Sequence, residues 1–313
     1  MKRFIHNITI LGIILLLINI AIEFLLFLRP NEYSYKRAYV EEHINDIRCL
    51  LLGNSHIVHA LKPSILGNGV FNMAIVGRGI VYDIEIAKRY VPQMNQLEIL
   101  IMPLDYSRFY FGRAKDNPNE MKKPSGRQGT YNRKCMYYKY MDIRVDGFWY
   151  WSELLNSRLD YMKRFLKSDV DARECDSLGY VKRLLSKRKD NWENKNLPKI
   201  IDTTIDANRV EQDLLFSRYC TLAELANNQG AKLVLIFTPL YKTYNNSTNP
   251  VVIKKMESFV ANLKQRYPNV EFYDYSTDKR FADEDFWDAS HLTDIGANKF
   301  SKIVKEEVLS SLE

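Results

Sequence analysis

Cysteine is scarce in this chain, and its cysteines are scattered. Four of the 313 residues are Cys, and no two of them form a Cys-x-x-Cys pair. The low number excludes a small domain built on a dense set of disulfides. Cys49 falls in a predicted strand, as a small buried hydrophobic residue, whereas a disulfide among Cys135, Cys175 and Cys220 stays open.

Nucleotide-binding loops, internal repeats and low-complexity segments are also missing. Gly77 and Gly79 are not followed by the rest of a Gly-x-Gly-x-x-Gly motif, and no Gly-Lys-Ser or Gly-Lys-Thr occurs. These absences exclude the common dinucleotide and P-loop sites. The hydrophobic fraction of 46% and the charged fraction of 27% are ordinary for a globular protein, so disorder is not expected.

One long apolar run is present near the N-terminus. Ile8–Leu28 is a run of 21 residues, almost all apolar, with Lys2 and Arg3 before it. As a helix it would be about 32 Å long, which suits a hydrocarbon core of about 30 Å. A cleaved signal peptide is disfavoured because the run is long and no small-residue cleavage site follows. We therefore predict a transmembrane anchor over residues 1–30.

Two polar residues interrupt the apolar run, Asn19 and Glu23. Glu23 either lies near the outer membrane interface or faces a partner helix. A polar connector is predicted over residues 31–46. Because the N-terminal tail is very short and the C-terminal part is large, we expect a single-pass membrane protein whose C-terminal domain is extracytoplasmic.

From residue 47 onward, short strand-like runs alternate with helix-like stretches, which predicts an α/β fold with a parallel sheet. The predicted strands are Ile47–Leu52, Val70–Ile75, Leu97–Met102, Lys232–Phe237 and Val270–Tyr273. The predicted helices start near His56, with an interruption at Lys62-Pro63, and span about Ile80–Tyr90, Ala207–Asn227 and Val252–Arg266. A last helix has a predicted core face of Ile295, Phe300, Ile303, Val304 and Val308. We expect a three-layer α/β/α domain over residues 47–313 with a five-stranded parallel sheet.

The segment at about residues 108–199 breaks this alternation. Its Lys and Arg residues exceed its Asp and Glu residues by ten, so the basic character of the chain is concentrated there. An amphipathic helix is predicted from Phe148 to about Leu166. We interpret the segment as a mostly helical, basic and aromatic-rich insert. It is either a solvated cap with a buried aromatic face or a surface for an anionic partner.

Two short polar stretches, one at each end of the α/β pattern, carry reactive side chains. Asn54 and Ser55 follow the first predicted strand, and Asp288 and His291 lie three residues apart near the C-terminus. In an open parallel sheet, ligands bind beyond the carboxyl ends of the strands. A serine nucleophile needs a base such as His291 and an acid such as Asp288 that fixes the tautomer of the base.

These two stretches carry a family resemblance. Gly53-Asn54-Ser55 resembles the Gly-Asp-Ser block of the SGNH/GDSL hydrolase superfamily, and Asp288-x-x-His291 followed by Leu292 and Gly296-Ala297 is similar to its last block. The resemblance covers roughly residues 47–105 and 207–312. It implies a flavodoxin-like SGNH fold with Ser55 as nucleophile, His291 as base and Asp288 as the acid that orients it. An α/β-hydrolase is disfavoured because the Gly-x-Ser-x-Gly elbow is missing.

The resemblance also implies donors that stabilise an oxyanion. In the superfamily these are the serine N–H, a glycine N–H after the second strand and an asparagine after the third. Gly77 is the candidate for the glycine, with Gly79 as its substitute. No asparagine follows the third strand, so Asn54, Tyr106 or Ser107 is the candidate for the missing donor. Losing one such donor lowers turnover by on the order of 10²–10³ in a known case.

Other roles are open for the same residues. Ser55 taken alone is also typical of a helix N-cap, and His291 taken alone of a loop histidine bonded to backbone. His56 and His59 share a helix face and with His291 could mimic a metal site. Zinc ligands usually show tighter, paired spacing, so no metal is predicted. No cofactor is expected.

Within the superfamily, an N-terminal anchor plus a large insert resembles the proteins that D-alanylate teichoic acids or O-acetylate alginate and other surface polysaccharides. The resemblance implies a membrane-anchored esterase or O-acyltransferase that transfers or removes an acetyl- or D-alanyl-type group. Its expected partner is a cell-surface polysaccharide or other anionic polymer, and not nucleic acid. A transferase would also need an acyl-donor partner protein in the membrane, which Asn19 and Glu23 would contact. The alternative is a non-catalytic binding or assembly module for cell-envelope polysaccharide.

Overall fold

A computed structural model describes residues 1–28, 32–106, 109, 174–188, 209–246, 248 and 250–310, with the backbone alone for residues 22–28 and 209–212. The described residues belong to two compact units. One holds the residues up to Arg37, and the other holds those from Ala38 onward. The predicted domain boundaries stay predictions.

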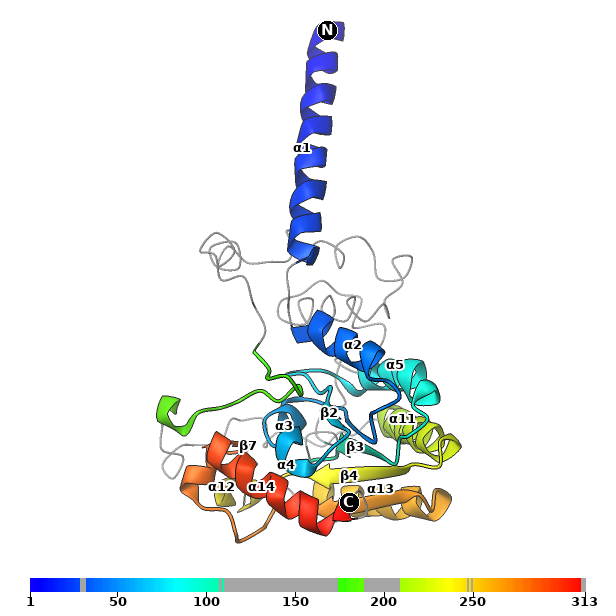
Figure 1. The fold of residues 1–313 in the computed structure, drawn as a ribbon, viewed down its shortest axis with the longest axis vertical. Coiled ribbons are helices and arrows are strands. Elements are labelled where there is room, and N and C mark those ends of the chain that lie inside the picture. The colour runs from blue at the N-terminus through cyan, green and yellow to red at the C-terminus, as the bar shows by residue number, and fades with distance from the viewer. Residues whose placement is uncertain are drawn as a thin grey trace. The chain divides into compact units, whose positions relative to one another are not determined.

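The predicted membrane segment is one continuous helix, α1 (Lys2–Leu28) (Figure 1). Its first 20 residues, Lys2–Ala21, have a mean hydropathy of 2.2, and none of the apolar window that qualifies as a span is buried inside the protein. By length and composition, α1 fits a membrane span or a signal anchor. A second helix, α2 (Glu32–Glu42), lies in the predicted polar connector.

The second unit is built on a five-stranded sheet whose neighbouring strands are all parallel. The order of its strands is β2-β1-β3-β4-β5. The strands are β1 (Cys49–Leu51), β2 (Val70–Asn72), β3 (Ile99–Pro103), β4 (Lys232–Phe237) and β5 (Val270–Asp274). This is the flavodoxin-like order, and the predicted α/β fold class is confirmed.

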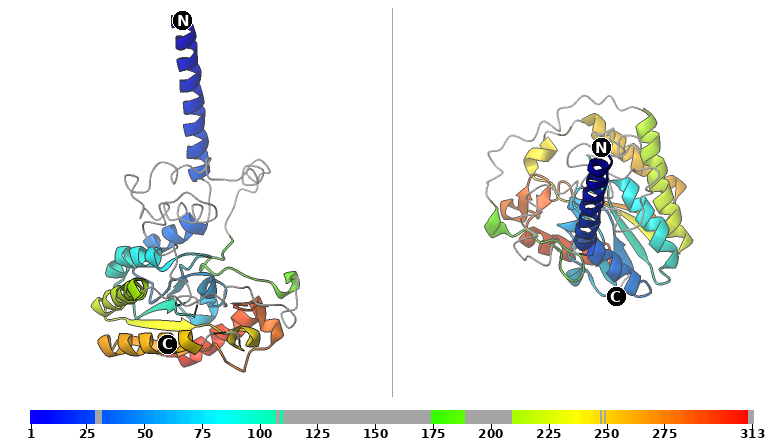
Figure 2. Two further views of the ribbon diagram at one scale, coloured as in Figure 1. Left: turned by 180° about the vertical axis from the view of Figure 1, so that it is seen from behind. Right: turned by 90° about the horizontal axis from the view of Figure 1, so that it is seen from above.

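Helices cover both faces of the sheet, which gives the three predicted layers (Figure 2). On one face, α5 (Ile80–Tyr90) and α13 (Pro250–Arg266) both pack against α11 (Arg209–Asn228). On the other face, α4 (Pro63–Leu66) packs against α14 (Asp294–Glu307). The three strands β1, β2 and β3 are buried along their whole length, as expected for a parallel sheet that is covered on both sides.

The helical stretch after β1 is broken where the sequence predicts it. Helix α3 covers Ser55–Val58, and α4 begins at Pro63, with Lys62 as its N-cap residue. Proline fixes its own φ and suits the first turn of a helix. The break lets the backbone after α3 turn back toward β2.

The last helix turns one predicted core residue toward solvent. Ile295 is 44% exposed, whereas the other four residues of the predicted face are buried. Gly296 precedes Phe300 by four residues and shares its buried face. Ile295 precedes Phe300 by five residues, which places it about 140° around the helix. The prediction of Ile295 as a core residue was wrong.

Residues 174–188, predicted as part of the insert, belong to the α/β unit. This stretch turns back on itself, so that Cys175 and Val181 form an antiparallel bridge, and it contains a short 3-10 helix, η4 (Leu185–Lys187). We call it the 174–188 segment. Apart from Phe109, the rest of the predicted insert, including the helix predicted from Phe148, lies outside the described residues.

Cys49, Cys175 and Cys220 are buried and free, so no disulfide joins them. Burial raises the pKa of the Cys49 thiol, and the nearby Glu98 carboxylate adds to this effect. Cys49 therefore stays protonated and packs as a small apolar residue. Cys135 lies outside the described residues.

Candidate active site

Ser55 lies in the first turn after β1, where glycine allows two strand ends to approach closely. Gly53 has a φ of 119°, which residues with a Cβ rarely adopt. A Cβ at Gly53 would lie 2.4 Å from Cδ of Pro103 at the end of β3. The order of the strands reverses between β1 and β3, and open α/β sheets bind ligands beside such a point. The fold thus places Ser55 at the expected site.

A buried ion pair holds this turn in place. Oδ1 of Asp83, in α5, accepts hydrogen bonds from the Gly53 N–H at 3.0 Å and from Arg78 Nε at 2.7 Å. The Arg78 and Asp83 side chains are 1% and 0% exposed. Because both charges are removed from water, loss of either would leave the other uncompensated. Arg78, which the sequence places only in a glycine-rich loop, therefore has a structural role.

Asn54, and not Ser55, is the N-cap of α3. The side-chain oxygen of Asn54 accepts a hydrogen bond from the His56 N–H at 3.0 Å. Ser55 is the first residue inside the helix. The N-cap role that was considered for Ser55 therefore belongs to Asn54. The Ser55 hydroxyl does not cap the helix and can bind another partner.

Ser55, His291 and Asp288 are joined by a continuous chain of hydrogen bonds, and we call them the triad. Oγ of Ser55 lies 2.8 Å from Nε2 of His291. Nδ1 of His291 lies 2.8 Å from both carboxylate oxygens of Asp288. Because a carboxylate only accepts, Nδ1 carries the proton and Nε2 is left to accept the proton of the serine hydroxyl. This tautomer is the one that a general base requires.

A tight hairpin, which the sequence did not predict, carries Asp288 and His291. Strand β6 (Phe286–Asp288) pairs antiparallel with β7 (His291–Leu292), and Asp288 lies opposite His291. Oδ1 of Asp288 accepts the backbone N–H groups of Ser290 and His291, both at 2.9 Å. The carboxylate therefore fixes the turn of the hairpin as well as the imidazole ring.

The surroundings of Asp288 keep its carboxylate ionised. Burial raises its pKa, but other groups outweigh this effect and hold the pKa well below its ordinary value. These groups are the His291 ring, through its hydrogen bond and its charge, the Ser290 N–H and the Arg183 guanidinium. An ionised carboxylate at this position stabilises an imidazolium on His291.

Helix α14 follows β7 directly and fixes the hairpin. Oγ1 of Thr293, its N-cap, accepts the Gly296 N–H at 3.3 Å and donates to the Glu284 carbonyl at 2.7 Å. A Cβ at Gly296 would lie 2.1 Å from the carbonyl oxygen of Asp285. The glycine of the family-like last block therefore allows α14 to lie directly against the turn before β6.

Three of the predicted oxyanion donors, Gly77, Gly79 and Tyr106, lie on the segments that follow β2 and β3. Gly77 lies in the exposed turn after β2 with a φ of 74°, and Gly79 is the N-cap residue of α5. Tyr106 is buried edge-on against Phe237, with ring centroids 4.6 Å apart. Within the described residues, none of these three donates a hydrogen bond to the triad. Ser107 lies outside the described residues.

Two nearby features bear on an oxyanion. The Ser55 N–H has no acceptor within the part of the chain that the structure describes, so it is available to a negatively charged oxygen. Pro103, the last residue of β3, packs on Gly53, and its carbonyl accepts the Tyr219 hydroxyl at 2.7 Å. The Ser55 N–H is thus available as one donor of an oxyanion hole.

Two more histidines surround His291. The ring centroids of His56 and His59 lie 4.9 and 6.0 Å from that of His291. Nδ1 of His59 lies 2.8 Å from the Val181 carbonyl and must donate to it, because a carbonyl only accepts. Among the described residues, no three His, Cys, Asp or Glu side chains are grouped to hold a metal ion.

One charged residue near the triad, Arg183, was not predicted from the sequence. Cζ of Arg183 lies 5.4 Å from the ring centroid of Trp287, the residue before Asp288. Burial lowers the pKa of the Arg183 guanidinium, while the Asp288 and Glu174 carboxylates raise it. Composition shows Arg183 only as one of many basic residues of the predicted insert. Its place beside Trp287 depends on a contact between segments far apart in the sequence.

No protein-family model matches the sequence, and no curated protein matches it. A solved structure from Streptococcus pneumonia, provisionally assigned as a platelet activating factor, is 11% identical with a TM-score of 0.45. It covers 88% of this chain and 90% of its own. A Bacteroides fragilis protein, provisionally assigned as an acylhydrolase, is 12% identical with a TM-score of 0.38, over 85% of this chain and 88% of its own. At such low scores these likenesses carry no inference about the reaction.

Proposed function

We propose that the chain is a serine acyl-ester enzyme in which Ser55 is the nucleophile. The 2.8 Å contacts that link Ser55, His291 and Asp288 support this proposal. Nε2 of His291 takes the hydroxyl proton while Oγ of Ser55 bonds to the acyl carbon, and the imidazolium then protonates the departing alcohol oxygen. Water or a second hydroxyl, deprotonated by His291, next removes the acyl group from Ser55.

The proposed substrate is an acyl ester of a cell-surface polymer. Hydrolysis and transfer use the same triad and differ only in whether water or a polymer hydroxyl accepts the acyl group. The arrangement of Gly53-Asn54-Ser55 after β1 and Asp288-x-x-His291 before α14 supports a place in the SGNH/GDSL superfamily. The apolar helix α1 supports a membrane-anchored member, and we propose that its α/β domain acts on acetyl- or D-alanyl-type groups outside the cytoplasm.

Labelling with a fluorophosphonate probe tests the proposed nucleophile. We expect the full-length chain in detergent to react at Ser55, and we expect the variants Ser55→Ala and His291→Ala to lose labelling. Ser64→Ala is the matched control, because Ser64 is an exposed serine in the neighbouring helix α4. A well-folded wild-type chain that the probe does not label would contradict the proposal.

The replacement of the asparagine after β3 favours a second candidate, a non-catalytic module that binds cell-envelope polysaccharide. In such a module, the triad would be a structural network without turnover. Binding to purified alginate and teichoic acid would then be equal in the wild type and in Ser55→Ala, and neither would react with the probe.

A further inference from the structure

The 174–188 segment is hydrogen-bonded to α3, which carries Ser55, and to α14, which directly follows the hairpin of Asp288 and His291. The Val181 N–H donates to the Val58 carbonyl of α3 at 3.1 Å, and the Val181 carbonyl accepts from His59 at 2.8 Å. Two residues later, the Arg183 carbonyl accepts the Asp294 N–H, at the start of α14, at 2.7 Å. The backbone on both sides of the Arg183 side chain is therefore fixed relative to Ser55 and His291.

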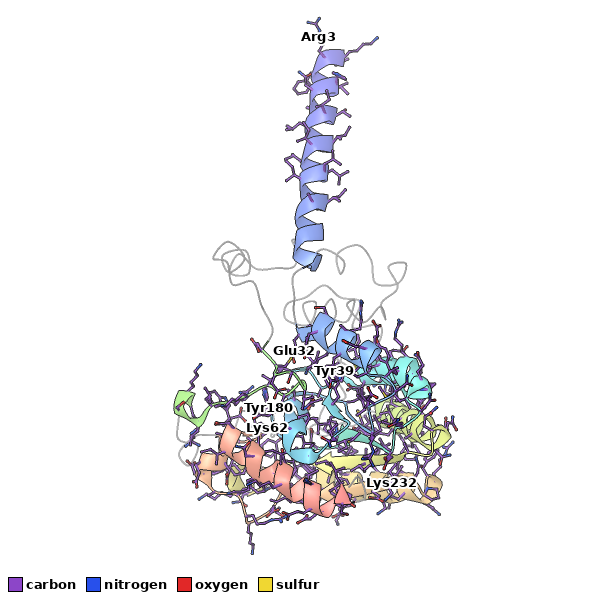
Figure 3. All side chains as sticks on the ribbon, in the orientation of Figure 1. Arg3, Glu32, Tyr39, Lys62, Tyr180 and Lys232 are labelled. Carbon is purple, nitrogen blue, oxygen red and sulfur yellow. The ribbon has the colours of Figure 1, made fainter. Side chains whose placement is uncertain are left out.

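The same segment is also anchored in its middle and at its C-terminal end. Nζ of Lys62 lies 5.8 Å from the ring centroid of Tyr180, and the two residues are labelled next to each other in Figure 3. Arg188 donates to the Asp283 carboxylate at 2.6 Å and to the Asp283 and Phe286 carbonyls at 2.7 Å. Three hydrogen bonds from the Arg188 guanidinium thus hold the segment to the turn before β6.

The guanidinium of Arg183 is arranged differently. It stacks on the Trp287 ring, and its buried Nε has no hydrogen-bond partner. Among the described residues, the Arg183 side chain makes no hydrogen bond and no ion pair within 4.0 Å. A guanidinium carries five N–H donors in a planar fork that matches a carboxylate or a phosphate. Stacking on an aromatic ring restricts the side chain and leaves these donors for another molecule.

The position of Arg183 indicates which part of a substrate it would meet. Trp287 lies in β6 directly before Asp288, so the Arg183 guanidinium lies against the hairpin that carries Asp288 and His291. During acylation, the imidazolium protonates the departing alcohol, so the alcohol part of the ester lies against His291. An anionic group on that alcohol would lie near the Arg183 guanidinium.

We propose that Arg183, stacked on Trp287, forms an anion subsite beside the triad and binds a carboxylate or phosphate on the alcohol part of the substrate. This inference rests on the proposed serine acyl-ester activity and narrows its substrate class to esters of anionic alcohols. The proposal explains why an Arg is held at this point by backbone hydrogen bonds although its own donors have no partner in the described chain.

Three acetate esters test the subsite on the full-length protein. They are 3-acetoxybenzoate, 3-acetoxyphenyl phosphate and the uncharged methyl 3-acetoxybenzoate. In each, Oγ of Ser55 bonds to the acetyl carbon, the ester C–O bond breaks, and the proton taken by His291 passes to the phenol oxygen. Water then releases acetate. The measured quantity is kcat/KM for each anionic ester divided by kcat/KM for the neutral ester.

We expect Arg183→Gln to lower this ratio by roughly 10- to 100-fold, as for the loss of a charge-assisted hydrogen bond, and Arg183→Lys to restore part of it. Comparison of the carboxylate and phosphate esters shows which anion the subsite prefers. Lys187→Gln is the matched control, because it removes an exposed positive charge from the same segment. Its ratio should equal that of the wild type.

An equal loss for all three esters in Arg183→Gln would overturn the subsite, because it would mean that Arg183 only supports Asp288. Absence of turnover of both anionic esters by a chain that still labels at Ser55 would also overturn it. If the probe does not label the wild type at Ser55, the proposed function is overturned instead. Failure of the subsite and failure of the proposed function are therefore distinguishable.

Discussion

At the scale of single residues, the depressed pKa of Asp288 links the triad to the stability of the fold. The folded-state pKa lies below the value of about 3.9 that an aspartate has in an unfolded chain. A carboxylate of this kind stabilises the native state at pH values above its unfolded pKa. The stabilisation is lost as the pH falls from that value toward the folded-state pKa.

We therefore expect the wild type to lose stability more steeply than Asp288→Asn between about pH 5 and pH 3, because the asparagine has no proton to bind there. The measurement is the free energy of unfolding from urea titrations at pH 5, 4 and 3. Asp213→Asn, which changes an exposed carboxylate of α11, is the control and should follow the wild type. Parallel pH profiles for the wild type and Asp288→Asn would contradict the linkage.

The sequence showed the triad because its residue types and spacing are themselves informative. Ser55 follows a buried strand, and the separation of three residues between Asp288 and His291 suits one hairpin. Arg78 and Arg183 carry no such signal. Arg78 pairs with Asp83 in α5, and Arg183 lies over Trp287 in β6. The sequence alone does not show that these residues are partners.

At the scale of elements, the packing of α14 on the turn before β6 sets the position of His291. This turn is the 3-10 helix η7 (Asp283–Asp285). The buried Asp285 carboxylate accepts a hydrogen bond from Lys299, one turn into α14, and Gly296 lies against the Asp285 carbonyl. The hairpin that carries Asp288 and His291 lies between these two anchored elements.

We expect Gly296→Ala to force α14 away from η7, because its Cβ would overlap the Asp285 carbonyl oxygen. Overpacking of this kind costs about 1–3 kcal/mol in the free energy of unfolding. A shift of the hairpin should also lower the rate of probe labelling at Ser55 by roughly 10- to 100-fold.

Urea unfolding and labelling kinetics measure the two effects, and Lys302→Ala, an exposed change on the same helix, is the control. A Gly296→Ala variant as stable and as reactive as Lys302→Ala would show that the contact does not position the hairpin.

Long periodic elements were the most predictable part of the fold. Helix α5 has the predicted bounds, Ile80–Tyr90, and the five predicted strands overlap the five observed ones. The hairpin was missed because its strands of three and two residues are too short to show a period and, unlike β1 and β2, do not lie in a longer apolar run. Ile295 was misassigned because it lies within the apolar pattern of α14 but off its buried face.

At the scale of the whole molecule, the helix α1 has the length and hydropathy of the membrane anchor that we propose for the enzyme. A span of this length and hydropathy needs no further contact to hold a protein in a bilayer. Electrostatic attachment by the basic residues of the predicted insert would be weakened by salt, whereas hydrophobic insertion would not.

We expect the full-length chain to stay in the membrane fraction after washes with 1 M salt and with alkaline carbonate. A chain that starts at residue 32 should appear in the soluble fraction. Protease added to spheroplasts should digest the α/β domain of the full-length chain, and a cytoplasmic control protein should stay intact. Release of the full-length chain by salt, or full protection of its domain, would contradict an anchored extracytoplasmic enzyme.

The packing of the 174–188 segment on the α/β unit was not predicted from the sequence. Its composition matches the basic insert, but its backbone is bonded to α3 and α14. Composition reports the average character of a stretch. Individual hydrogen bonds decide which part of a long insert packs on the α/β domain. Such bonds cannot be recognised from composition.

The distance along the chain between Ser55 and His291 also affects when the site is assembled. The two residues are 236 positions apart, and the 174–188 segment, which is bonded to α3 and α14, lies between them in the sequence. A ribosome makes the nucleophile 236 residues before the base, so a growing chain holds Ser55 without its base for that part of its synthesis. The proposed enzyme would therefore be inert during that interval, and it would become reactive only after His291 has been made and α14 has folded.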